Sequence, residues 1–422
     1  MAMAEPAQTI TSPPDAILPR AAEHCLDAAG GVSPVIVVMG ARQTGKSTLV
    51  RTLAPYRDRP YFSLDELDIR GQAQSDPDAL VRRAPRITLD EVQRVPDLLL
   101  AIKRAVDEAP RRTPGRFVLT GSANLLTMRR VSESLAGRAS YVTLWPLTHR
   151  EQLGSGTTGM WEALLSTPSG KWFDIVRDDP TPAMDWRELA FRGGLPTPAH
   201  WLPSAEQRTV WWRGYVQTYL ERDLRDLTAV ENLADFRRLM RAVCLRLGSL
   251  VNQTELGRDI GMAQPQVHRY LNLLETSFQL VRLPAYAVNR TKRLIKTPKA
   301  YWSDTGLALF LAGEPKPGGA HLENIILTDL IAWRDAHSQQ AEILYWRTAT
   351  GQEVDFVVER GERLLPIEVK ATKRPSYKAA ANITAFMQEY PEKCDGGLLL
   401  HCGSETEWLA EGVLAAPWWK VV

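Results

Sequence analysis

The sequence contains only four cysteines, which are far apart and form no Cys-x-x-Cys pair: Cys25, Cys244, Cys394 and Cys402. This spacing argues against a disulfide framework and a structural zinc site, so we expect reduced thiols in a cytoplasmic protein. No apolar stretch approaches the length of about 18 residues that a membrane span requires. The first 15 residues also lack the basic and apolar regions of a signal peptide. We therefore expect no membrane partner.

The sequence also lacks an excess of either charge, because it contains 51 Lys and Arg residues and 49 Asp and Glu residues. This balance neither supports nor excludes nucleic-acid binding, so any basic surface must be local. Hydrophobic residues make up 44% of the chain and charged residues 24%, which excludes a largely disordered protein. A length of 422 residues predicts about three domains.

An apolar run at residues 35–39, typical of a buried parallel strand, leads directly into GARQTGKS. This segment fits the phosphate-binding pattern G-x-x-x-x-G-K-[ST], in which backbone N–H groups surround the phosphates. Lys46 would reach the β- and γ-phosphate oxygens, and the Ser47 hydroxyl would ligate Mg²⁺. The positive end of the helix that follows favours an anion there. We expect ATP and Mg²⁺ to bind through Gly40, Ala41, Arg42, Gln43, Thr44, Gly45, Lys46, Ser47 and Thr48.

An acidic pair, Asp90 and Glu91, follows a second apolar strand at residues 86–89. We expect Asp90 to complete the Mg²⁺ shell and Glu91 to polarise the attacking water. A third strand, residues 117–119, leads into TGSAN. Strands that alternate with helical stretches predict an α/β parallel sheet with its chemistry in the loops after the strands. The sequence therefore predicts ATP hydrolysis as well as ATP binding.

A helix, glycine turn and helix are predicted around Gly261. Leu256 and Ile260 are spaced for one helix face, and a second helix begins near residue 264. The pattern resembles a helix-turn-helix, whose second helix enters the DNA major groove with its N-terminal end. Four polar side chains near that end are predicted DNA contacts: Gln264, Gln266, His268 and Arg269.

Residues 283–301 are predicted to form a hairpin with a basic tip, as in the wing of a winged helix. Its five cations, with no acidic residue among them, would contact DNA phosphates without reading sequence: Arg290, Lys292, Arg293, Lys296 and Lys299. Winged helices also bind proteins, and basic runs also occur as solvated surface. Protein docking is therefore the alternative to DNA binding.

A second set of charged residues lies near the C-terminus. Asp355 is in a predicted strand at residues 353–358, and the next predicted strand, residues 364–369, leads to Glu368 and Lys370. Residues two apart on a strand share a face, so Glu368 and Lys370 point the same way. Asp355 and Glu368 could hold Mg²⁺ while Lys370 orients water or offsets phosphate charge. The pattern indicates phosphodiester cleavage or, without activity, DNA binding alone.

Longer segments carry a resemblance to a known family: LDEVQRVPDLL (residues 89–99), TGSAN (120–124), LAGRA (135–139), GGLP (193–196) and GQEVDFVVERGERLLPIEVK (351–370). The sequence resembles bacterial and archaeal AAA-type ATPases related to the STAND and archaeal-ATPase groups, over nearly the whole chain. The resemblance implies an α/β fold with a P-loop AAA-type parallel sheet core, a helical lid, a winged helix and a C-terminal PD-(D/E)xK nuclease-like α/β domain. The respective boundaries are expected at residues 1–152, 153–236, 237–311 and 312–422.

The resemblance also implies roles for individual residues. Ser122 and Asn124 match a sensor position beside the γ-phosphate, and Arg138 matches an arginine finger that acts on a neighbouring subunit. Self-association into a ring or another homo-oligomer would follow. Pro196 would lie near the adenine, and Glu323 matches an additional acidic position of the metal site. A surface ion pair for Arg138 and a plain turn for Pro196 are the alternatives.

Three functions fit these expectations. The first is an ATPase that binds and remodels duplex or branched DNA as a motor or switch. The second is a Mg²⁺-dependent DNA nuclease gated by ATP. The third is a nucleotide-controlled regulatory switch that binds proteins instead of DNA.

Overall fold

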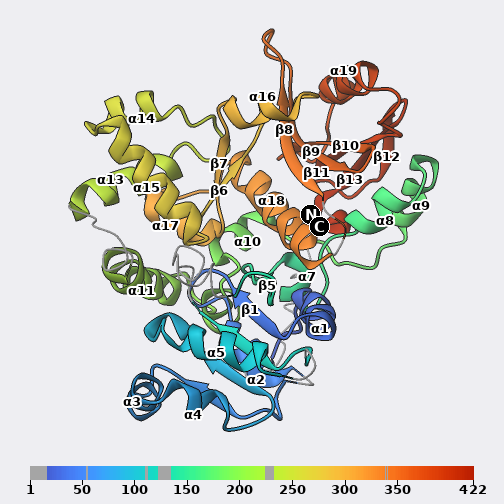
Figure 1. Ribbon diagram of the computed structural model, residues 1–422. Helices are drawn as coiled ribbons and strands as arrows, with labels where there is room; N and C mark the ends of the chain where they lie inside the picture. Colours follow the sequence, from blue (N-terminus) through green and yellow to red (C-terminus); the bar gives the residue numbers. More distant parts are fainter. Residues whose placement is uncertain are drawn as a thin grey trace.

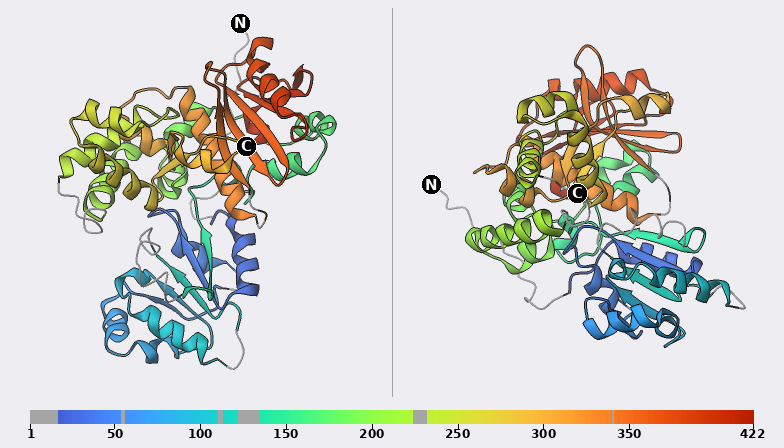
Figure 2. Two further views of the ribbon diagram at one scale, coloured as in Figure 1. Left: turned by 45° about the horizontal axis from the view of Figure 1, so that its top comes forward. Right: turned by 60° about the vertical axis from the view of Figure 1, so that its left-hand side comes forward.

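The computed structural model describes residues 17–53, 56–109, 113–121, 135–223, 232–337, 339 and 341–422. The chain forms an N-terminal α/β section, a helical section and a C-terminal α/β section (Figure 1). The helical and C-terminal sections lie side by side, and the N-terminal section projects from beneath them (Figure 2). Within the described part of the chain, no helix is long and apolar enough to cross a membrane.

The N-terminal section is built on a five-stranded sheet in which every pair is parallel. This confirms the predicted α/β core. The strands lie in the order β2 (Tyr61–Ser63), β3 (Ile87–Asp90), β4 (Phe117–Thr120), β1 (Val35–Met39) and β5 (Ala139–Thr143).

Helices cover both faces of this sheet because the inner strand β1 is apolar throughout. Val35 and Val37 pack with α5 (Leu98–Asp107), whereas Ile36 and Val38 pack with α1 (Ala22–Val32) and α2 (Lys46–Thr52). The strand is buried at every position, as expected for a central parallel strand. The helices of this section are α1 (Ala22–Val32), α2 (Lys46–Thr52), α3 (Leu67–Ser75), α4 (Pro77–Val81), the short 3₁₀ turn η1 (Val92–Arg94) and α5 (Leu98–Asp107).

The connection at residues 154–185 contains short helices. After α7 (His149–Gln152), the chain forms α8 (Trp161–Ser166), η3 (Ser169–Lys171) and α9 (Trp172–Arg177). Trp161 and Trp172 are buried against the C-terminal section. Long-range burial of these indoles stabilises helices too short to be recognised by periodicity.

The helical section contains the predicted helix, turn and helix. Asn252 caps α14 by accepting the backbone N–H groups of Thr254 and Glu255, and Gly261 ends it at φ 67°, which suits glycine. The elements are α10 (Trp186–Arg192), the π-helical turn η4 (Thr197–Trp201), α11 (Ala205–Tyr215), η5 (Val216–Asp223), α13 (Leu233–Cys244), α14 (Gln253–Ile260), α15 (Gln264–Thr276), β6 (Leu280–Leu283), α16 (Arg290–Ile295), β7 (Lys299–Trp302) and α17 (Thr305–Ala312).

The predicted hairpin with a basic tip is only partly correct. β6 and β7 pair in antiparallel fashion, with Leu283 opposite Lys299. The chain between them is not a simple β-turn, because it contains α16 and lies against the C-terminal sheet. The backbone N–H of Tyr286 donates to the carbonyl oxygen of Tyr345 at 2.5 Å. Two of the five cations of this segment, Arg293 and Lys299, are buried.

The C-terminal section packs helix α18 (Gly319–Ala336) against a six-stranded mixed sheet. One continuous core joins this section to the helical section, with Tyr301 and Trp302 of β7 beside Leu322 and Phe356. The sheet order is β12 (Glu407–Ala410), β13 (Val413–Pro417), β11 (Gly397–His401), β10 (Arg363–Lys370), β9 (Glu353–Arg360) and β8 (Glu342–Arg347), and the helices that follow α18 are η6 (Tyr377–Ala380), α19 (Ala381–Glu389) and α20 (Trp418–Val421).

Candidate functional site

The phosphate-binding loop, residues 40–47, leaves β1 in a conformation that depends on glycine. Gly40 has φ 145°, and a Cβ placed there would lie 2.2 Å from the carbonyl oxygen of Leu144. Gly45 has φ 95° and directly precedes α2. Gln43 also takes a positive φ, of 64°. These backbone angles turn the loop around the end of α2, where N–H groups and the helix dipole attract phosphate.

Lys46 is folded back over this loop. Its Nζ donates to the carbonyl oxygens of Gly40 at 3.1 Å and Ala41 at 2.7 Å, and the residue is 6% exposed. Burial lowers the pKa of Lys46 to about 8, against the opposing pull of the Glu91 and Asp90 carboxylates. A phosphate group would give this ammonium a stronger partner than two carbonyl oxygens.

Asp90, the last residue of β3, faces the start of α2. The Ser47 hydroxyl donates to Asp90 Oδ1 at 3.1 Å. The hydroxyls of Tyr61 and Thr120, on the two neighbouring strands, also donate to this carboxylate. Hydroxyl and carboxylate oxygens are the donors that Mg²⁺ takes from proteins, so Ser47 and Asp90 fit such an ion. The sequence pattern did not reveal Tyr61 or Thr120 as partners of Asp90.

Glu91 lies directly after Asp90 in a left-handed conformation with φ 56° and ψ 44°. Non-glycine residues adopt this conformation at a cost and often do so at functional sites. Its carboxylate accepts a hydrogen bond from the Gln93 side chain. The carboxylate is thereby held beside Asp90, at the same edge of the sheet as the loop.

A pocket of about 550 Å³ lies beside the phosphate-binding loop. Pro196 is in its wall, and a Cβ placed on Gly45 would lie 3.8 Å from Pro196 Cγ. The pocket is suited to a flat, mostly apolar ring because its lining is rich in apolar side chains. Its lining includes Ile17, Leu18, Arg20, Thr48, Leu49, Leu147, Pro196, His200 and Trp201.

The GGLP segment in this wall is fixed by a distant carboxylate. Asp304 Oδ2 accepts the backbone N–H groups of Gly194 at 2.7 Å and Leu195 at 2.9 Å. A Cβ on Gly193 would lie 2.3 Å from Asp304 Oδ1, so only glycine fits there. Burial raises the pKa of Asp304, although these N–H groups favour the ionised form. No sequence pattern indicates Asp304, because the contact joins segments 110 residues apart.

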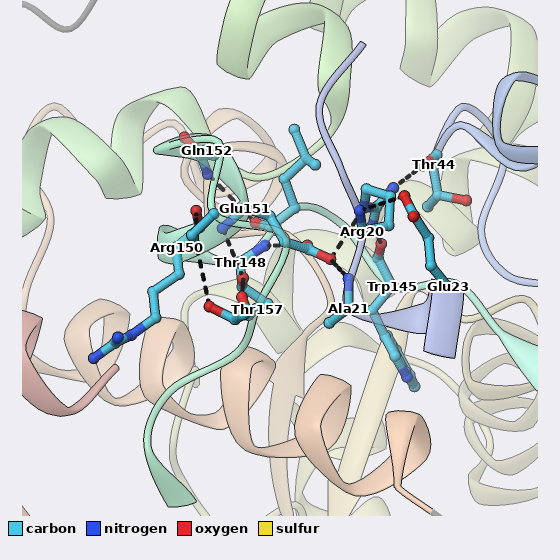
Figure 3. A network of polar contacts seen from close by, with 12 residues as sticks. Arg20, Ala21, Glu23, Thr44, Trp145, Thr148, Arg150, Glu151, Gln152 and Thr157 are labelled. Atoms are coloured by element: carbon cyan, nitrogen blue, oxygen red, sulfur yellow. Dashed lines mark hydrogen bonds and ion pairs between the residues drawn. The ribbon is translucent and has the colours of Figure 1, made fainter. Parts of the chain in front are cut away.

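Arg20 connects the phosphate-binding loop to the segment that follows β5 and to α7 (Figure 3). Its Nη1 donates to the carbonyl oxygen of Thr44 at 2.9 Å, and its Nη2 donates to that of Trp145 at 2.5 Å. Arg20 Nε lies 3.1 Å from Glu151 Oε1 in a pair that is almost fully buried. Glu151 also caps α7, since its Oε2 accepts the backbone N–H of Thr148. Sequence reasoning missed Arg20, which precedes the first predicted strand.

Arg138 lies at the opposite edge of the sheet from the loop. It precedes β5, whose first residue Ala139 is opposite Val35, whereas the loop follows Met39. Strand β1 therefore separates Arg138 from the loop by roughly 13 Å. Its guanidinium forms two hydrogen bonds to Asp107, at 2.6 and 2.8 Å. The predicted sensor residues Ser122 and Asn124 lie outside the described residues.

The structure brings the C-terminal charged residues together at the edge of β9 and β10. Ile367 is opposite Phe356, so Asp355 and Glu368 are next in register. Asp355 Oδ2 accepts the backbone N–H of Val369 at 2.9 Å, and Lys370 Nζ lies 2.5 Å from Glu368 Oε1. Glu323, on α18, accepts the hydroxyl of Tyr301 at 3.0 Å.

These carboxyl groups interact strongly. Burial raises the pKa of Glu323 to about 7 and that of Glu368 to about 8, with Asp355 as the next contributor in both. Burial raises the pKa of Asp355 as well. Within the described ranges, however, no three His, Cys, Asp or Glu side chains are placed to hold a metal ion together.

The predicted DNA contacts separate into two groups. Gln264, His268 and Arg269 are exposed at the start of α15, but Gln266 is half-buried and its Nε2 contacts the hydroxyl of Tyr270 at 3.2 Å. In the basic segment, the exposed cations are Arg290, Lys292 and Lys296.

The prediction that Arg293 contacts DNA is wrong. Arg293 is 5% exposed, and its guanidinium is ion-paired with Glu342 at 2.6 Å and with Glu359. Lys299 is also buried, beside Glu353 and Asp355. The reason is the same for both residues: acidic residues of the C-terminal sheet, distant in sequence, neutralise them.

Three family models match successive parts of the chain. Residues 32–153 match a model described as an AAA domain, which confirms the predicted AAA-type core. Residues 183–317 match a domain of unknown function, DUF8612, and residues 318–421 match a domain of unknown function, DUF4143.

Two mycobacterial proteins are 32% identical to this chain over 354 residues, which cover 82% of this chain and 72% of theirs. They are uncharacterized protein Mb2031c of Mycobacterium bovis and uncharacterized protein Rv2008c of Mycobacterium tuberculosis. Among solved structures, the Walker-type ATPase PABY2304 of Pyrococcus abyssi is 15% identical, with a TM-score of 0.44 over 70% of this chain and 99% of that chain. RuvB of Thermotoga maritima is 17% identical, with a TM-score of 0.29 over 65% and 93%. These low scores identify no function.

Proposed function

Since this chain belongs to the family of the mycobacterial proteins Mb2031c and Rv2008c, with an AAA domain at residues 32–153, we propose that it binds ATP with Mg²⁺ and hydrolyses it. The observation that carries this proposal is the 3.1 Å hydrogen bond between Ser47 and Asp90, beside the ammonium of Lys46. It joins the loop to the acidic strand end within one small site. The side chains expected to bind phosphate, Mg²⁺ and the attacking water therefore lie close together.

Each residue of the site has its own role in the proposed hydrolysis. Lys46 leaves the carbonyl oxygens of Gly40 and Ala41 and binds phosphate oxygens. Bound Mg²⁺ neutralises charge on the phosphates. Glu91, next to Asp90 and held by Gln93, orients the attacking water and accepts its proton. Adenine occupies the apolar pocket beside Pro196, since this pocket adjoins Gly45.

Replacement of the loop lysine tests the proposal directly. Lys46→Ala removes the ammonium that holds the phosphates, so we expect loss of measurable phosphate release. Lys171→Ala changes an exposed lysine of η3 and is expected to leave turnover unchanged. Both variants are checked for unaltered thermal unfolding. Undiminished turnover in folded Lys46→Ala would refute ATP hydrolysis at this loop.

We also propose that ATP turnover is coupled to DNA held by the helical section. Its support is the pair α14 and α15 around Gly261, with Gln264, His268 and Arg269 exposed at the start of α15. The exposed cations of α16 and its flank provide further positive charge for phosphates. The assay is phosphate release with no DNA and with single-stranded, duplex or four-way-junction DNA. Stimulation by one form supports the proposal, and no binding of any form contradicts it.

One observation favours a second candidate, a nucleotide-controlled switch that binds a protein through α16. Three large aliphatic side chains stand exposed around this helix: Val288 at 71%, Leu294 at 85% and Ile295 at 80%. DNA phosphates gain nothing from aliphatic neighbours, whereas an acidic protein segment with apolar residues would contact both kinds of group. Leu294→Ser with Ile295→Ser separates the two functions. DNA affinity is unchanged by this double variant if the cations bind DNA, and protein binding is lost if α16 is the docking helix.

We further propose that Arg138 acts on the nucleotide of a neighbouring subunit. Within its own chain it is at the wrong edge of the sheet, so it could contribute only across an interface. The ion pair with Asp107 would then be exchanged for the neighbour's phosphates.

A further inference from the structure

Lys299 extends from β7 of the helical section into the acidic cluster of the C-terminal section, which comprises Glu323, Glu353, Asp355 and Glu368. Its Nζ is 2.5 Å from Glu353 Oε1 and 3.8 Å from Asp355 Oδ1. The residue is only 2% exposed. A lysine buried to this extent needs acidic partners, because an unpaired ammonium in the interior is strongly disfavoured.

The same strand provides a second contact. Tyr301, two residues further along β7, donates its hydroxyl to Glu323 Oε2 at 3.0 Å. Lys299 and Tyr301 share one face of the strand because side chains alternate along it. One face of β7 therefore covers the acidic cluster, with an ammonium at one position and a hydroxyl at the other.

The cluster still carries an unused acceptor. Glu368 Oε1 is paired with Lys370 at 2.5 Å, but Glu368 Oε2 is buried without a hydrogen-bond partner in the described structure. Four carboxyl groups thus face three cationic groups: the ammonium groups of Lys299 and Lys370, and the guanidinium of Arg347, whose Nε lies 3.5 Å from Glu353 Oε2. A buried carboxylate oxygen with no partner is costly, so the cluster favours additional positive charge.

A divalent cation would compete with Lys299 for this charge. Mg²⁺ and similar ions take several oxygen ligands at about 2.0–2.6 Å, and the oxygens of Glu353 and Asp355 that could serve face the ammonium. A dication beside that ammonium would also be repelled. This explains why no three of the acidic side chains are positioned around a common point among the described residues.

We propose that Lys299 is the resident cation of the acidic cluster and that the cluster takes a divalent cation only when Lys299 is absent from it. The cluster is then a latent metal site closed by the helical section. This inference is independent of ATP hydrolysis. It bears on the expected nuclease, because Asp355, Glu368 and Lys370 would be inactive while Lys299 occupies the cluster.

The experiment measures binding of Mn²⁺ to the full chain carrying Asp90→Ala, which removes the metal ligand of the nucleotide site. Free Mn²⁺ is followed by electron paramagnetic resonance during titration. In this parent we expect no Mn²⁺ site that depends on Asp355. Lys299→Met keeps the apolar stem that packs in the interior but removes the charge. We expect this variant to gain one Mn²⁺ site that binds at least about tenfold more tightly than any site in the parent. The reason is that removing one positive charge close to the site changes the affinity by more than tenfold at an effective dielectric constant of about 20.

Two further variants provide the controls. Lys299→Met combined with Asp355→Asn is expected to lose the new site, and Lys299→Arg, which keeps the charge, is expected to gain none. Thermal unfolding establishes that each variant is folded, and Mn²⁺ should raise the Tm of Lys299→Met alone. An Asp355-dependent site in the parent, or a folded Lys299→Met variant that gains no site, would overturn the proposal. Mg²⁺-dependent DNA cleavage by the unmodified chain that Asp355→Ala abolishes would overturn it as well.

Discussion

Asp304 accepts the backbone N–H of Gly194 at 2.7 Å, across 110 residues of sequence. The carboxylate belongs to the turn between β7 and α17, and Gly194 belongs to the segment that carries Pro196 into the wall of the nucleotide pocket. Both groups are buried, and their hydrogen bond couples the start of α17 to this part of the pocket wall.

Asp304→Asn is expected to weaken this connection. An amide group can accept hydrogen bonds only through its oxygen, so one of the N–H groups now bound by Asp304 would face another donor. We expect the free energy of unfolding to fall by about 1–3 kcal/mol, and nucleotide affinity to fall with it. Urea unfolding and titration with a fluorescent ATP analogue measure the two effects. Asp58→Asn, at an exposed position, is the control, and unchanged affinity in a folded Asp304→Asn protein would contradict the coupling.

Arg138→Ala is expected to reduce ATP turnover by roughly 10³-fold while leaving nucleotide binding intact, as for loss of an arginine finger. Mixing this variant with Glu91→Gln should restore part of the turnover. In the mixture, an Arg138→Ala subunit with an intact Glu91 receives its arginine from a Glu91→Gln neighbour. Phosphate release is measured against the mixing ratio.

Arg82→Ala is the matched control for Arg138→Ala. Arg82 forms a surface ion pair with Glu108 at 3.1 Å, close to the Asp107 that pairs with Arg138. Its replacement should leave turnover unchanged. Turnover at the original rate in Arg138→Ala, or no recovery in the mixture, would contradict action across subunits.

His149 should make the fold sensitive to acid. Burial lowers its pKa from 6.5 to about 4, aided by Arg150 and opposed by Asp179. The folded protein therefore binds this proton less readily than the unfolded chain. The contribution of neutral His149 to the free energy of unfolding is fully present above about pH 6.5. It is lost as the pH falls towards 4, and the total loss is about 3 kcal/mol. Urea unfolding at a series of pH values measures the slope.

His149→Phe removes the titrating group and can still pack against Trp418, whose ring centroid is 5.1 Å from that of the histidine. We expect a flatter dependence of stability on pH between 4 and 6.5. His24→Gln, at an exposed position on α1, should retain the original slope. An equal slope in the His149→Phe and unmodified proteins would show that other groups cause the acid sensitivity.

The exposed and buried cations of the basic segment should respond differently to replacement. Changing Arg290, Lys292 and Lys296 together to Gln is expected to weaken DNA binding and to reduce the slope of log affinity against log salt by about 3, one for each lost phosphate contact. A second triple variant serves as the control, with exposed cations elsewhere changed to Gln: Arg57, Lys171 and Arg213. An unchanged slope in the first triple variant would contradict the DNA proposal.

Arg293→Gln should instead destabilise the fold by about 3 kcal/mol, because it removes the buried guanidinium from the carboxylate of Glu359 and leaves that carboxylate only the exposed Arg290, at 3.8 Å. Thermal and urea unfolding measure this loss. Arg290→Gln, which changes a neighbouring exposed arginine, should cost far less. A small effect of Arg293→Gln on stability would show that the ion pair contributes little.

The nucleotide site could be predicted because its information is local in sequence. Gly40, Gly45, Lys46 and Ser47 lie within eight residues, and the spacing itself reflects how a backbone surrounds phosphate. Asp90 was recognisable as the acidic end of an apolar strand. Its Oδ1 lies 3.1 Å from the Ser47 hydroxyl oxygen, as that pattern predicts.

The rest of the site depends on contacts that no local pattern encodes. Arg20 forms an ion pair with Glu151, and Lys299 forms one with Glu353. Asp304 accepts a hydrogen bond from Gly194. Each contact joins residues more than 50 positions apart. The basic segment shows the consequence. A run of cations without acidic neighbours in sequence indicates exposed charge, but the neighbours of Arg293 and Lys299 come from the C-terminal sheet. The charge of a segment is therefore known only after its tertiary partners are known.

Helices α8 and α9 lie before the helical section in sequence but against the C-terminal section in space. Glu162 pairs with Arg360 at 2.7 Å, and the backbone N–H of Ser169 donates to Asp395. The C-terminal section is thus packed against helices that precede it by about 200 residues in the sequence. A break of the chain near residue 318 would therefore separate the C-terminal sheet from α8 and α9, two helices that pack against it.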